Sequence, residues 1–597
     1  MTPTLKNKVT DPDGDKSTVT FEVWTTDAAG KPKTKVNLNN DNPYGVIVSE
    51  PVASGKNAEI TVPWGKLSPG QTYTFHTSAH DGSLYETEWS PWAKFKLRER
   101  AVDIILPAPD KAAPNPAHDD SWQPMPGWGT VDWSNPARKT TKPEREEHCE
   151  TSTDGKSEKC LNTRPATKDD LEVAEEARSK MKSTRALTPP LHAECEDVSV
   201  GKYLSLLKRD RACMYQVLDV SLKDKATNQE EHFQRFLTSY QMQTDMAGKS
   251  IQLWSRLTPM PMPEGKKPFP AQPGAIKLTI SPQCEGCEDK PSYDWSGQLM
   301  WGGSFDIDPH EETGTETLTW SGAVTDAAST KDIKRTLMMS FAPYGQFSTS
   351  VPGNWDVSES HGQIGNPAYV RCDTVYTKPG CVMPQYMPGY VFNTKKTPAA
   401  AAHAWLMQEK IRGQAPLNYL PDRRGTTGVH GERNAFDRDP DANRKVICPD
   451  GWAKDHGHPG TTAVTDISSG DLPSCDEFTF AASYQSGGMP KAMKPAHIEG
   501  GQTAPVGSGD ECLQTFSRKL TSSGNWHLFD DDRQAAPTFN EKCGRSTMSG
   551  WINSTSMSRF PAFAKKFHLL DQDAYFVRTP GFEKCDASGA VVKCDIR

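Results

Sequence analysis

The sequence predicts a multi-domain, mainly β protein with α+β parts and disulfide bridges. At 597 residues the chain exceeds what one hydrophobic core supports, so several domains are expected. Its 47 prolines and 45 glycines favour many turns over long helices. Its 14 cysteines, an even number, indicate a disulfide framework and a secreted, extracellular location. No run of about 18 apolar residues occurs, so no membrane span is expected.

Residues 1–98 are predicted to form a small β-sandwich of the fibronectin or immunoglobulin kind. Val19, Phe21 and Val23 alternate with polar residues, which is the pattern of a strand with one buried face. Turn residues such as Ser68-Pro69-Gly70 separate this strand from the ones that follow.

The same segment resembles the fibronectin type III-like modules of secreted actinobacterial proteins. The resemblance rests on the stretch from Thr4 to Trp24 and on Ser90-Pro91-Trp92. Such modules usually bind a partner or act as spacers, so the resemblance implies a cell-surface or protein partner. The acidic turn at residues 11–15 fits either a calcium site or a plain turn, and the plain turn is favoured.

Residues 99–189 are predicted to be a proline-rich linker with one short helix. Prolines recur between Pro107 and Pro126 and argue against regular structure there. Tryptophans in the same stretch indicate that it packs against a domain. Thr167 is a suitable cap for a helix that runs to about Lys182, with acidic residues in its first turn.

Residues 190–395 are predicted to form a second β-rich domain, in which Cys372 and Cys381 close a hairpin. The strand candidates are residues 214–220, 276–280, 315–320 and 337–341.

Residues 396–447 are expected to connect this domain to the last one. A helix should begin at Thr397-Pro398, because threonine caps helices and proline suits the first helical position. A charged, irregular stretch follows. The histidines His430, His456 and His458 are either metal ligands or solvated loop residues, and the solvated interpretation is favoured.

The cysteines fall into neighbouring pairs, and seven local disulfides would use every sulfur atom. Cys284 and Cys287 have the spacing of half a zinc site, but zinc sites normally need four ligands, so a structural bridge is favoured. The expected pairs are Cys149–Cys160, Cys195–Cys213, Cys284–Cys287, Cys372–Cys381, Cys448–Cys475, Cys512–Cys543 and Cys585–Cys594.

The predicted last domain, residues 448–597, contains two adjacent acids, Asp476 and Glu477, that are candidates for chemistry. Neighbouring residues of a regular strand point to opposite faces. Both acids can therefore serve one site only if the strand ends or bends there. In that case one carboxylate would bind a metal and the other would contact a water molecule. The spacing alone favours the alternative, an exposed acidic turn before a strand.

The residues around this pair resemble the signature of the secreted NucA/NucB-type deoxyribonucleases. That signature is Asp-Glu followed by an aromatic residue, a position that is usually proline, an apolar residue and alanine. The resemblance covers roughly residues 445–580 and is closest to the actinobacterial branch. The matching residues are Asp476, Glu477, Phe478, Phe480 and Ala481, with Thr479 in place of proline, followed by Gly487-Gly488, Asn553 and a closing helix and strand.

The resemblance implies a ββα-metal nuclease fold, in which two short strands and a helix hold one divalent ion, Mg²⁺ or Mn²⁺. It implies that Glu477 activates a water, that Asp476 binds the metal or fixes its ligands, and that Asn553 ligates the ion. Hard oxygen ligands suit such an ion, which polarises a scissile phosphate. A glutamate of some family members is replaced here by Gln485-Ser486, and Glu499 is the candidate to take its role.

Cationic side chains are also expected beside the phosphate. Arg545 and Arg559 flank Asn553 and are the candidates. Residues 541–578 carry six Lys or Arg and three Asp or Glu, a local net charge of +3. The whole chain has a net charge of −8, so any contact with DNA has to be local.

The leading hypothesis is a secreted metal-dependent endonuclease that hydrolyses DNA with little sequence preference, as a toxin or as a DNA-degrading enzyme. A second hypothesis is a catalytically degenerate binding or structural protein of the cell envelope or of an assembled particle. The long insertion at residues 489–552 favours this second hypothesis. A third is a ribonuclease on the same scaffold.

Overall fold

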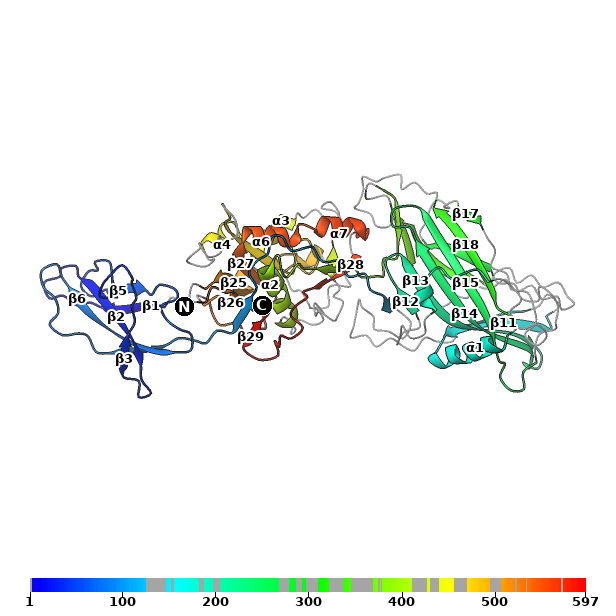
Figure 1. Cartoon of the computed structure of the whole chain (residues 1–597), viewed down its shortest axis with the longest axis horizontal. Coiled ribbons are helices and arrows are strands. Elements are labelled where there is room, and N and C mark those ends of the chain that lie inside the picture. Colours follow the sequence, from blue (N-terminus) through cyan, green and yellow to red (C-terminus); the bar gives the residue numbers. More distant parts are fainter. Residues whose placement is uncertain are drawn as a thin grey trace.

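The computed structural model is elongated, with three lobes in a row (Figure 1). The N-terminal lobe and a lobe with a large sheet lie at opposite ends, and the C-terminal lobe lies between them. Strands hold 38% of the residues and helices 15%, which confirms a mainly β protein. The structure describes residues 3–124, 146–151, 155–181, 187–196, 205–267, 279–285, 293–296, 310–320, 337–344, 369–373, 376, 378–410, 427–429, 440–455, 470–493, 506–520, 523–532, 534–570 and 573–597.

The N-terminal lobe is built from two sheets that share one core. Val19, Phe21 and Val23 are at most 1% exposed, as their alternation predicts. The Asp11 carboxylate accepts hydrogen bonds from the backbone amides of Asp13 and Gly14 at 2.8 and 2.9 Å, so it closes a turn. One sheet pairs β1 (Thr4–Lys8) with β5 (Asn57–Thr61), and the other contains β3 (Pro32–Lys35), β2 (Thr18–Thr26), β6 (Thr72–His80) and β7 (Ala93–Lys96), with β4 (Ile47–Val48) on β2.

The prediction of a linker at residues 99–189 is corrected, because strands of this segment join two different sheets. The prolines follow β8 (Val102–Leu106) rather than interrupt it, and β8 buries its apolar side chains in the C-terminal lobe. The predicted helix is confirmed as α1 (Lys168–Lys180), which Thr167 and Asp170 cap in a capping box. The other described strands of the segment are β9 (Gln123–Pro124), β10 (Glu146–Thr151) and β11 (Ser157–Pro165).

The large-sheet lobe pairs long antiparallel strands in a sheet that is covered on both faces. On one face Leu171 of α1 packs with Val217, and on the other Val370 of a second sheet packs with Met214. The nine-stranded sheet contains β10, β11, β13 (Arg211–Asp224), β14 (Glu230–Thr244), β15 (Ser250–Met260), β18 (Glu312–Trp320) and β17 (Tyr293–Ser296), with β12 (Ser205–Leu207) and β9 beside β13. The second sheet contains β16 (Thr279–Glu285), β19 (Leu337–Tyr344), β20 (Tyr369–Asp373) and β21 (Gly380–Val382).

The strands predicted for this lobe lie within β13, β18 and β19, so its β-rich character is confirmed. The fourth candidate, residues 276–280, overlaps the start of β16, and residues 276–278 lie outside the described part of the chain.

The C-terminal lobe surrounds α2 (Pro398–Lys410), the helix predicted at Thr397-Pro398. Every residue from Pro398 to Gln408 is buried, so this helix is the core of the lobe and not part of a connector. Its alanines are small enough for the sheet and α6 to approach closely. The six-stranded sheet contains β24 (Pro473–Phe478), β27 (Gly544–Ser549), β25 (Leu513–Lys519), β26 (Trp526–Asp530), β8 and β29 (Val592–Asp595).

Smaller elements complete this lobe. The lobe therefore includes residues well before residue 448, where the predicted last domain begins. A second sheet contains β22 (Gly389–Val391), β28 (Asp573–Arg578) and β23 (Thr427–Val429). The other helices are α3 (Pro440–Ile447), α4 (Trp452–Asp455), α6 (Gly550–Met557) and α7 (Phe560–Lys566), with short 3₁₀ turns at Ala193–Cys195, Lys491–Met493 and Gly509–Glu511.

Six predicted disulfides are confirmed and place the chain in an oxidising, extracellular compartment. The seventh predicted pair includes Cys287, which lies outside the described residues. Among the described helices, none is long and apolar enough to cross a membrane. The six bonds are Cys149–Cys160, Cys195–Cys213, Cys372–Cys381, Cys448–Cys475, Cys512–Cys543 and Cys585–Cys594.

A buried ionic cluster joins the large-sheet lobe to the C-terminal lobe. Arg371 Nη1 donates to Asp573 Oδ1 at 2.6 Å, and Arg209 also pairs with this carboxylate. Arg209 Nε donates to the Phe567 carbonyl oxygen at 2.7 Å, and His568 Nδ1 lies 3.2 Å from the Asp373 carboxylate. Each charge in the cluster has an opposite charge beside it, and all of these side chains are buried. Ion pairs shielded from water therefore join the two lobes.

Candidate active site

The two predicted acids lie on β24, an edge strand of the six-stranded sheet. Asp476 is paired with Ser546 and Glu477 with Arg545 across the antiparallel register to β27. β24 ends at Phe478, directly after the two acids. Both acids lie within the paired part of the strand, so the prediction that they serve one site stays a prediction.

Glu477 is buried and Asp476 is partly buried. Glu477 is 6% exposed, and burial raises the pKa of its carboxyl, an effect that Arg444 partly opposes. Burial also raises the pKa of Asp476 well above its usual range, and the neighbouring charge of Glu477 raises it further. A carboxyl whose ionised form is disfavoured by burial and by a neighbouring acid is typical of catalytic sites.

Arg444 of α3 supplies the cation beside the pair, and no sequence motif indicates this role. Its Nε lies 3.1 Å from Glu477 Oε1, while its side chain stays 53% exposed. Both Glu477 and Asp476 raise the pKa of Arg444. This guanidinium therefore contacts the acid pair on one side and solvent on the other.

A disulfide holds Arg444 in this position. Cys475 immediately precedes Asp476, and it is bonded to Cys448 at the end of α3. The Cys448 amide donates to the Arg444 carbonyl oxygen, so one helical turn separates the arginine from the bridge. The predicted Cys448–Cys475 pair was thus the signal that could have identified Arg444.

Asn553 of α6 is hydrogen-bonded to the same strand. Its Nδ2 donates to the Cys475 carbonyl oxygen and to Ser474 Oγ, both at 2.9 Å. The described residues offer no hydrogen bond to its Oδ1. The side chain is thus fixed beside the acid pair with an amide oxygen available as a ligand.

Two antiparallel strands and one helix thus surround the acid pair. β27 leads into α6, whose start is capped by Ser549 through a hydrogen bond from the Ile552 amide. α6 packs against both β24 and β27. Of the predicted site residues, Asp476 and Glu477 lie on β24 and Asn553 lies on α6, which packs against that strand.

Arg545 is not available to bind phosphate, which corrects its predicted role. Its side chain is 2% exposed, and Nη2 pairs with Asp510 at 2.6 Å. Its Nη1 donates to the Ile447 carbonyl oxygen at 3.1 Å, and its guanidinium stacks on Trp452. The sequence placed this arginine near the site correctly, but its charge serves to hold the end of α3.

The predicted role of Arg559 is also corrected. Its Nη2 donates to the Pro116 carbonyl oxygen at 2.8 Å and lies near His118. Burial, together with the charge of Arg559, lowers the pKa of His118 to about 4. No contact among the described residues links Arg559 to the acid pair, because α7 directs it toward the segment that follows β8.

The predicted glycine pair packs against the helix that carries Arg444. A Cβ at Gly488 would lie 2.1 Å from the Asn443 carbonyl oxygen, so only glycine fits. Asn443 in turn donates to the Ala481 carbonyl oxygen at 2.9 Å. These contacts fix α3 against the turn that follows β24.

Several other candidates lie outside the described residues, namely Glu499, His430, His456 and His458. Within the described residues, one group of three Cys, His, Asp or Glu ligand atoms is close enough to share an ion, at Cys149, Glu158 and Cys160. Its two cysteines are bonded to each other, so it is not a metal site.

No protein-family model matches this chain, and no curated protein is significantly similar to it in sequence.

Proposed function

We propose that this chain is a metal-dependent endonuclease that hydrolyses phosphodiester bonds of DNA, with the acid pair of β24 at its centre. The proposal is supported by the ion pair of Arg444 with Glu477 and by Asn553, which is hydrogen-bonded to Cys475, the residue before Asp476 on the same edge strand. Oxygen ligands, an acid pair with raised pKa values and a half-exposed cation are the groups that such hydrolysis requires.

The side chains present fit a divalent ion with oxygen ligands. The Asp476 carboxylate and Asn553 Oδ1 would hold it, and their hard oxygens suit Mg²⁺ or Mn²⁺. Such an ion, when bound, would polarise the scissile phosphate and stabilise the leaving oxygen.

The chain's own residues would act around that ion. Glu477 would accept a proton from the attacking water. Arg444 reaches both Glu477 and solvent, so it would orient that carboxylate and also contact a phosphate oxygen. This single guanidinium replaces Arg545 and Arg559 as the cation of the site.

Plasmid cleavage tests the proposal. Supercoiled plasmid incubated with the full chain and Mg²⁺ or Mn²⁺ should be nicked, and EDTA should prevent nicking. Glu477→Gln should reduce the rate by about 100-fold or more, because it removes the base while keeping the shape. Arg444→Ala should raise KM and lower kcat, and Arg444→Lys should restore only part of the loss.

Asp586→Asn, in an exposed turn of the same lobe, serves as the matched control and should cut normally. Plasmid left intact by the unmodified chain under all metal conditions would refute the proposal. Equal cleavage by Glu477→Gln and the unmodified chain would refute the assignment of the base. A parallel reaction on single-stranded RNA separates a deoxyribonuclease from a ribonuclease.

The second candidate function is a binding or structural protein of the cell envelope with a degenerate nuclease site. The observation that favours it is the near-complete burial of Glu477, whose carboxylate is engaged by Arg444. In that case titration calorimetry should show either no Mn²⁺ binding to the unmodified chain or binding that Asp476→Asn leaves unchanged.

A further inference from the structure

One sheet of the N-terminal lobe carries a group of partly exposed aromatic side chains on its outer face. Trp24 of β2 and His76 of β6 lie on the side of this sheet that faces away from the core. Trp89 and Trp92, which precede β7, contact His76 and are 43% and 41% exposed. Among the described residues, six of the ten exposed large apolar side chains belong to residues 44–92, so such exposure is concentrated in this lobe.

The rings of this face form an ordered stack. The His76 ring centroid lies 4.2 Å from that of Trp89 and 3.8 Å from that of Trp92, with interplanar angles of 18° and 12°. Since both indoles are nearly parallel to one imidazole, they cover its two sides. Trp24 meets Trp92 edge-on, at 6.1 Å and 88°. The described residues place no second ring on Trp89 and no hydrogen bond on the indole N–H of Trp89 or Trp92.

The charges in contact with this stack are already paired. Glu22 Oε2 lies 3.1 Å from His76 Nε2, and the same carboxylate forms an ion pair with Lys35. Although burial alone would raise the pKa of the Glu22 carboxyl, hydrogen bonds from Lys35 and His76 hold it below its usual value. Residues 1–98 carry 11 Lys or Arg and 11 Asp or Glu, so the lobe as a whole is neutral. A neutral partner matches this balance of charge.

The exposed aromatic area is small for a protein interface. A tryptophan side chain offers at most about 250 Å², so the exposed parts of Trp89 and Trp92 together come to roughly 200 Å². A stable protein–protein contact buries about 800 Å² on each partner. The face therefore fits a small partner with a flat surface better than it fits a folded domain.

We propose that this face binds a short neutral oligosaccharide, with one pyranose ring stacked on the free side of Trp89. The C–H groups on the face of a pyranose carry small positive partial charges, and the face of an indole is negative. A hydroxyl of the same or of the next sugar ring accepts a hydrogen bond from the Trp92 indole N–H. The stack holds both indoles in place before the sugar arrives, which lowers the entropy cost of binding.

An organic cation is also attracted to the face of an indole. At this stack, however, the carboxylate that would balance such a cation is Glu22, and Lys35 already pairs with it. A cation would therefore find the aromatic surface without an available counter-charge, whereas a sugar needs none.

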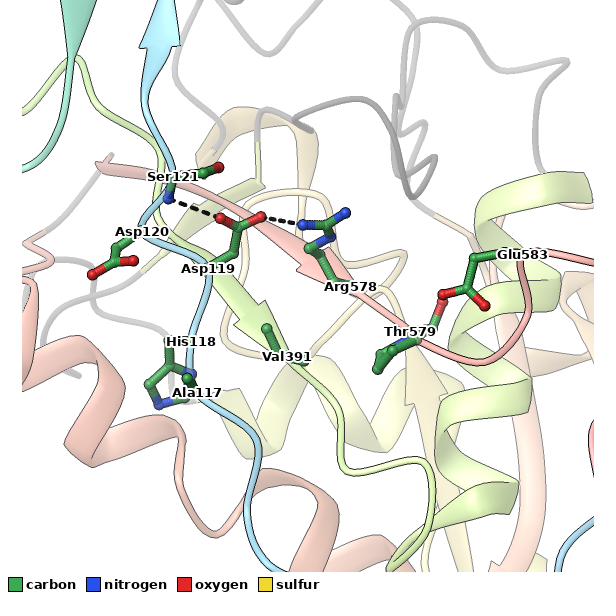
Figure 2. Close-up of a pocket in the computed structure, with 10 residues that line it drawn as sticks. Ala117, His118, Asp119, Asp120, Ser121, Val391, Arg578, Thr579 and Glu583 are labelled. Atoms are coloured by element: carbon green, nitrogen blue, oxygen red, sulfur yellow. Dashed lines mark hydrogen bonds and ion pairs between the residues drawn. The ribbon is translucent and has the colours of Figure 1, made fainter. Parts of the chain in front are cut away.

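A cavity of about 360 Å³ beside β22 and β28, in the C-terminal lobe, is the competing position for a small molecule (Figure 2). No tryptophan lines it, and its arginine, Arg578, pairs with Asp119 (Figure 2). It therefore lacks the stacking surface that the N-terminal lobe offers. Glu583 lines this cavity and is exposed, so a variant at this position tests whether a sugar binds there instead.

Isothermal titration calorimetry of the full chain with cellohexaose and with the hexamer of β-1,4-linked N-acetylglucosamine tests the proposal. We expect saturable binding of at least one of these neutral sugars. Trp89→Ala should weaken it about tenfold, the effect of one aromatic contact, and Trp89→Phe should restore part of the loss. Circular dichroism should show that both variants are folded, because the side chain is largely at the surface. Glu583→Gln should bind normally.

Absence of saturable binding of both sugars by the unmodified chain would overturn the proposal. Unchanged affinity in Trp89→Ala would place the sugar elsewhere, and loss of binding in Glu583→Gln would place it in the cavity of the C-terminal lobe. Tighter binding of tetramethylammonium or of a decaproline peptide than of either sugar would also overturn it. The inference does not depend on the proposed nuclease activity, and Trp89→Ala should nick plasmid at the normal rate, so the two proposals fail separately.

Discussion

Single residues at the acid pair show how charge and burial oppose each other. Asp476 is a carboxyl whose pKa burial raises, next to a second acid, in a strand that is otherwise well paired. A protein tolerates such a residue only if other interactions offset its unfavourable ionisation. Active sites are where this kind of local instability is retained.

The raised pKa of Asp476 predicts that its ionised form destabilises the fold. The pKa of Asp476 is 3.8 in the unfolded chain and higher in the folded chain. Stability therefore falls as the pH rises from the unfolded pKa through the folded pKa. Asp476→Asn should therefore raise the melting temperature at pH 7 by a few degrees. The difference should shrink as the pH is lowered toward 4.

Thermal unfolding followed by circular dichroism at pH 4 and pH 7 measures this effect. Asp13→Asn is a suitable control, because Asp13 is exposed in a turn of the N-terminal lobe. An Asp476→Asn variant that is less stable than the unmodified chain at pH 7 would contradict the prediction.

Among the elements, α3 and β24 form one unit because a disulfide joins them. The bridge between Cys448 and Cys475 closes a loop with a sequence separation of 27. Arg444 lies one helical turn before Cys448, and Asp476 directly follows Cys475. The arginine and the acids are thus held together by a covalent link and by one ion pair.

Removal of this bridge should separate stability from activity. The double variant Cys448→Ser with Cys475→Ser should lose roughly 3 kcal/mol of unfolding free energy, as a loop of this length predicts. The rate of plasmid nicking should fall by more than the loss of folded protein explains, because α3 no longer holds Arg444 beside Glu477.

The matched control is the double variant Cys585→Ser with Cys594→Ser, which removes the bridge near the C-terminus. It should lose a similar amount of stability and keep its activity below the melting temperature. Full activity in the variant that lacks Cys448 and Cys475 would show that Arg444 does not depend on the bridge. Denaturant unfolding and plasmid nicking provide the two measurements.

At the scale of the whole molecule, the large-sheet lobe and the C-terminal lobe form one structure. Asp573 of β28 is the centre of their interface, where two arginines, Arg209 and Arg371, contact its carboxylate. Although burial alone would raise the pKa of Asp573, the two arginines hold it below its usual value. Asp573 is the carboxylate that both arginines contact directly, and Asp373 lies beside them.

Asp573→Asn should therefore destabilise the contact by about 3–5 kcal/mol, because it removes the carboxylate that pairs with both buried arginines and leaves only Asp373 near them. Since the folded pKa is lowered, the stability from Asp573 is present above the unfolded value and is lost as pH falls through the folded one. Limited proteolysis at pH 7 should cut this variant between the lobes sooner than the unmodified chain. Asp595→Asn, exposed on β29, is the control, and equal cutting of Asp573→Asn and this control would contradict the prediction.

Much of the local structure was predictable because it depends on neighbouring residues. Alternation identified β2, Thr167 identified α1, and Thr397-Pro398 identified α2. The close spacing of the cysteines identified the six bonds that the structure describes. The candidate acids and Asn553 came from a short motif and a family resemblance, and their role stays a prediction.

The rest was not predictable because it depends on contacts between distant parts of the chain. Arg545 and Arg444 are both arginines close to the site in sequence, and only packing decides that one is buried on Asp510 and the other faces the acids. The prolines that suggested a linker also concealed β8, a short strand directly before them.

The sequence by itself determined the kind of chain: β-rich, cross-linked through neighbouring cysteines, with an acid pair before an apolar turn. Only the tertiary structure decided which strands share a sheet, since β8 and β26 pair although the contact between Val102 and Asp530 joins residues 428 positions apart. The physical reason is that apolar burial has no preferred direction. An alternating strand can cover any core of suitable shape, and hydrogen bonds between strands then fix the choice.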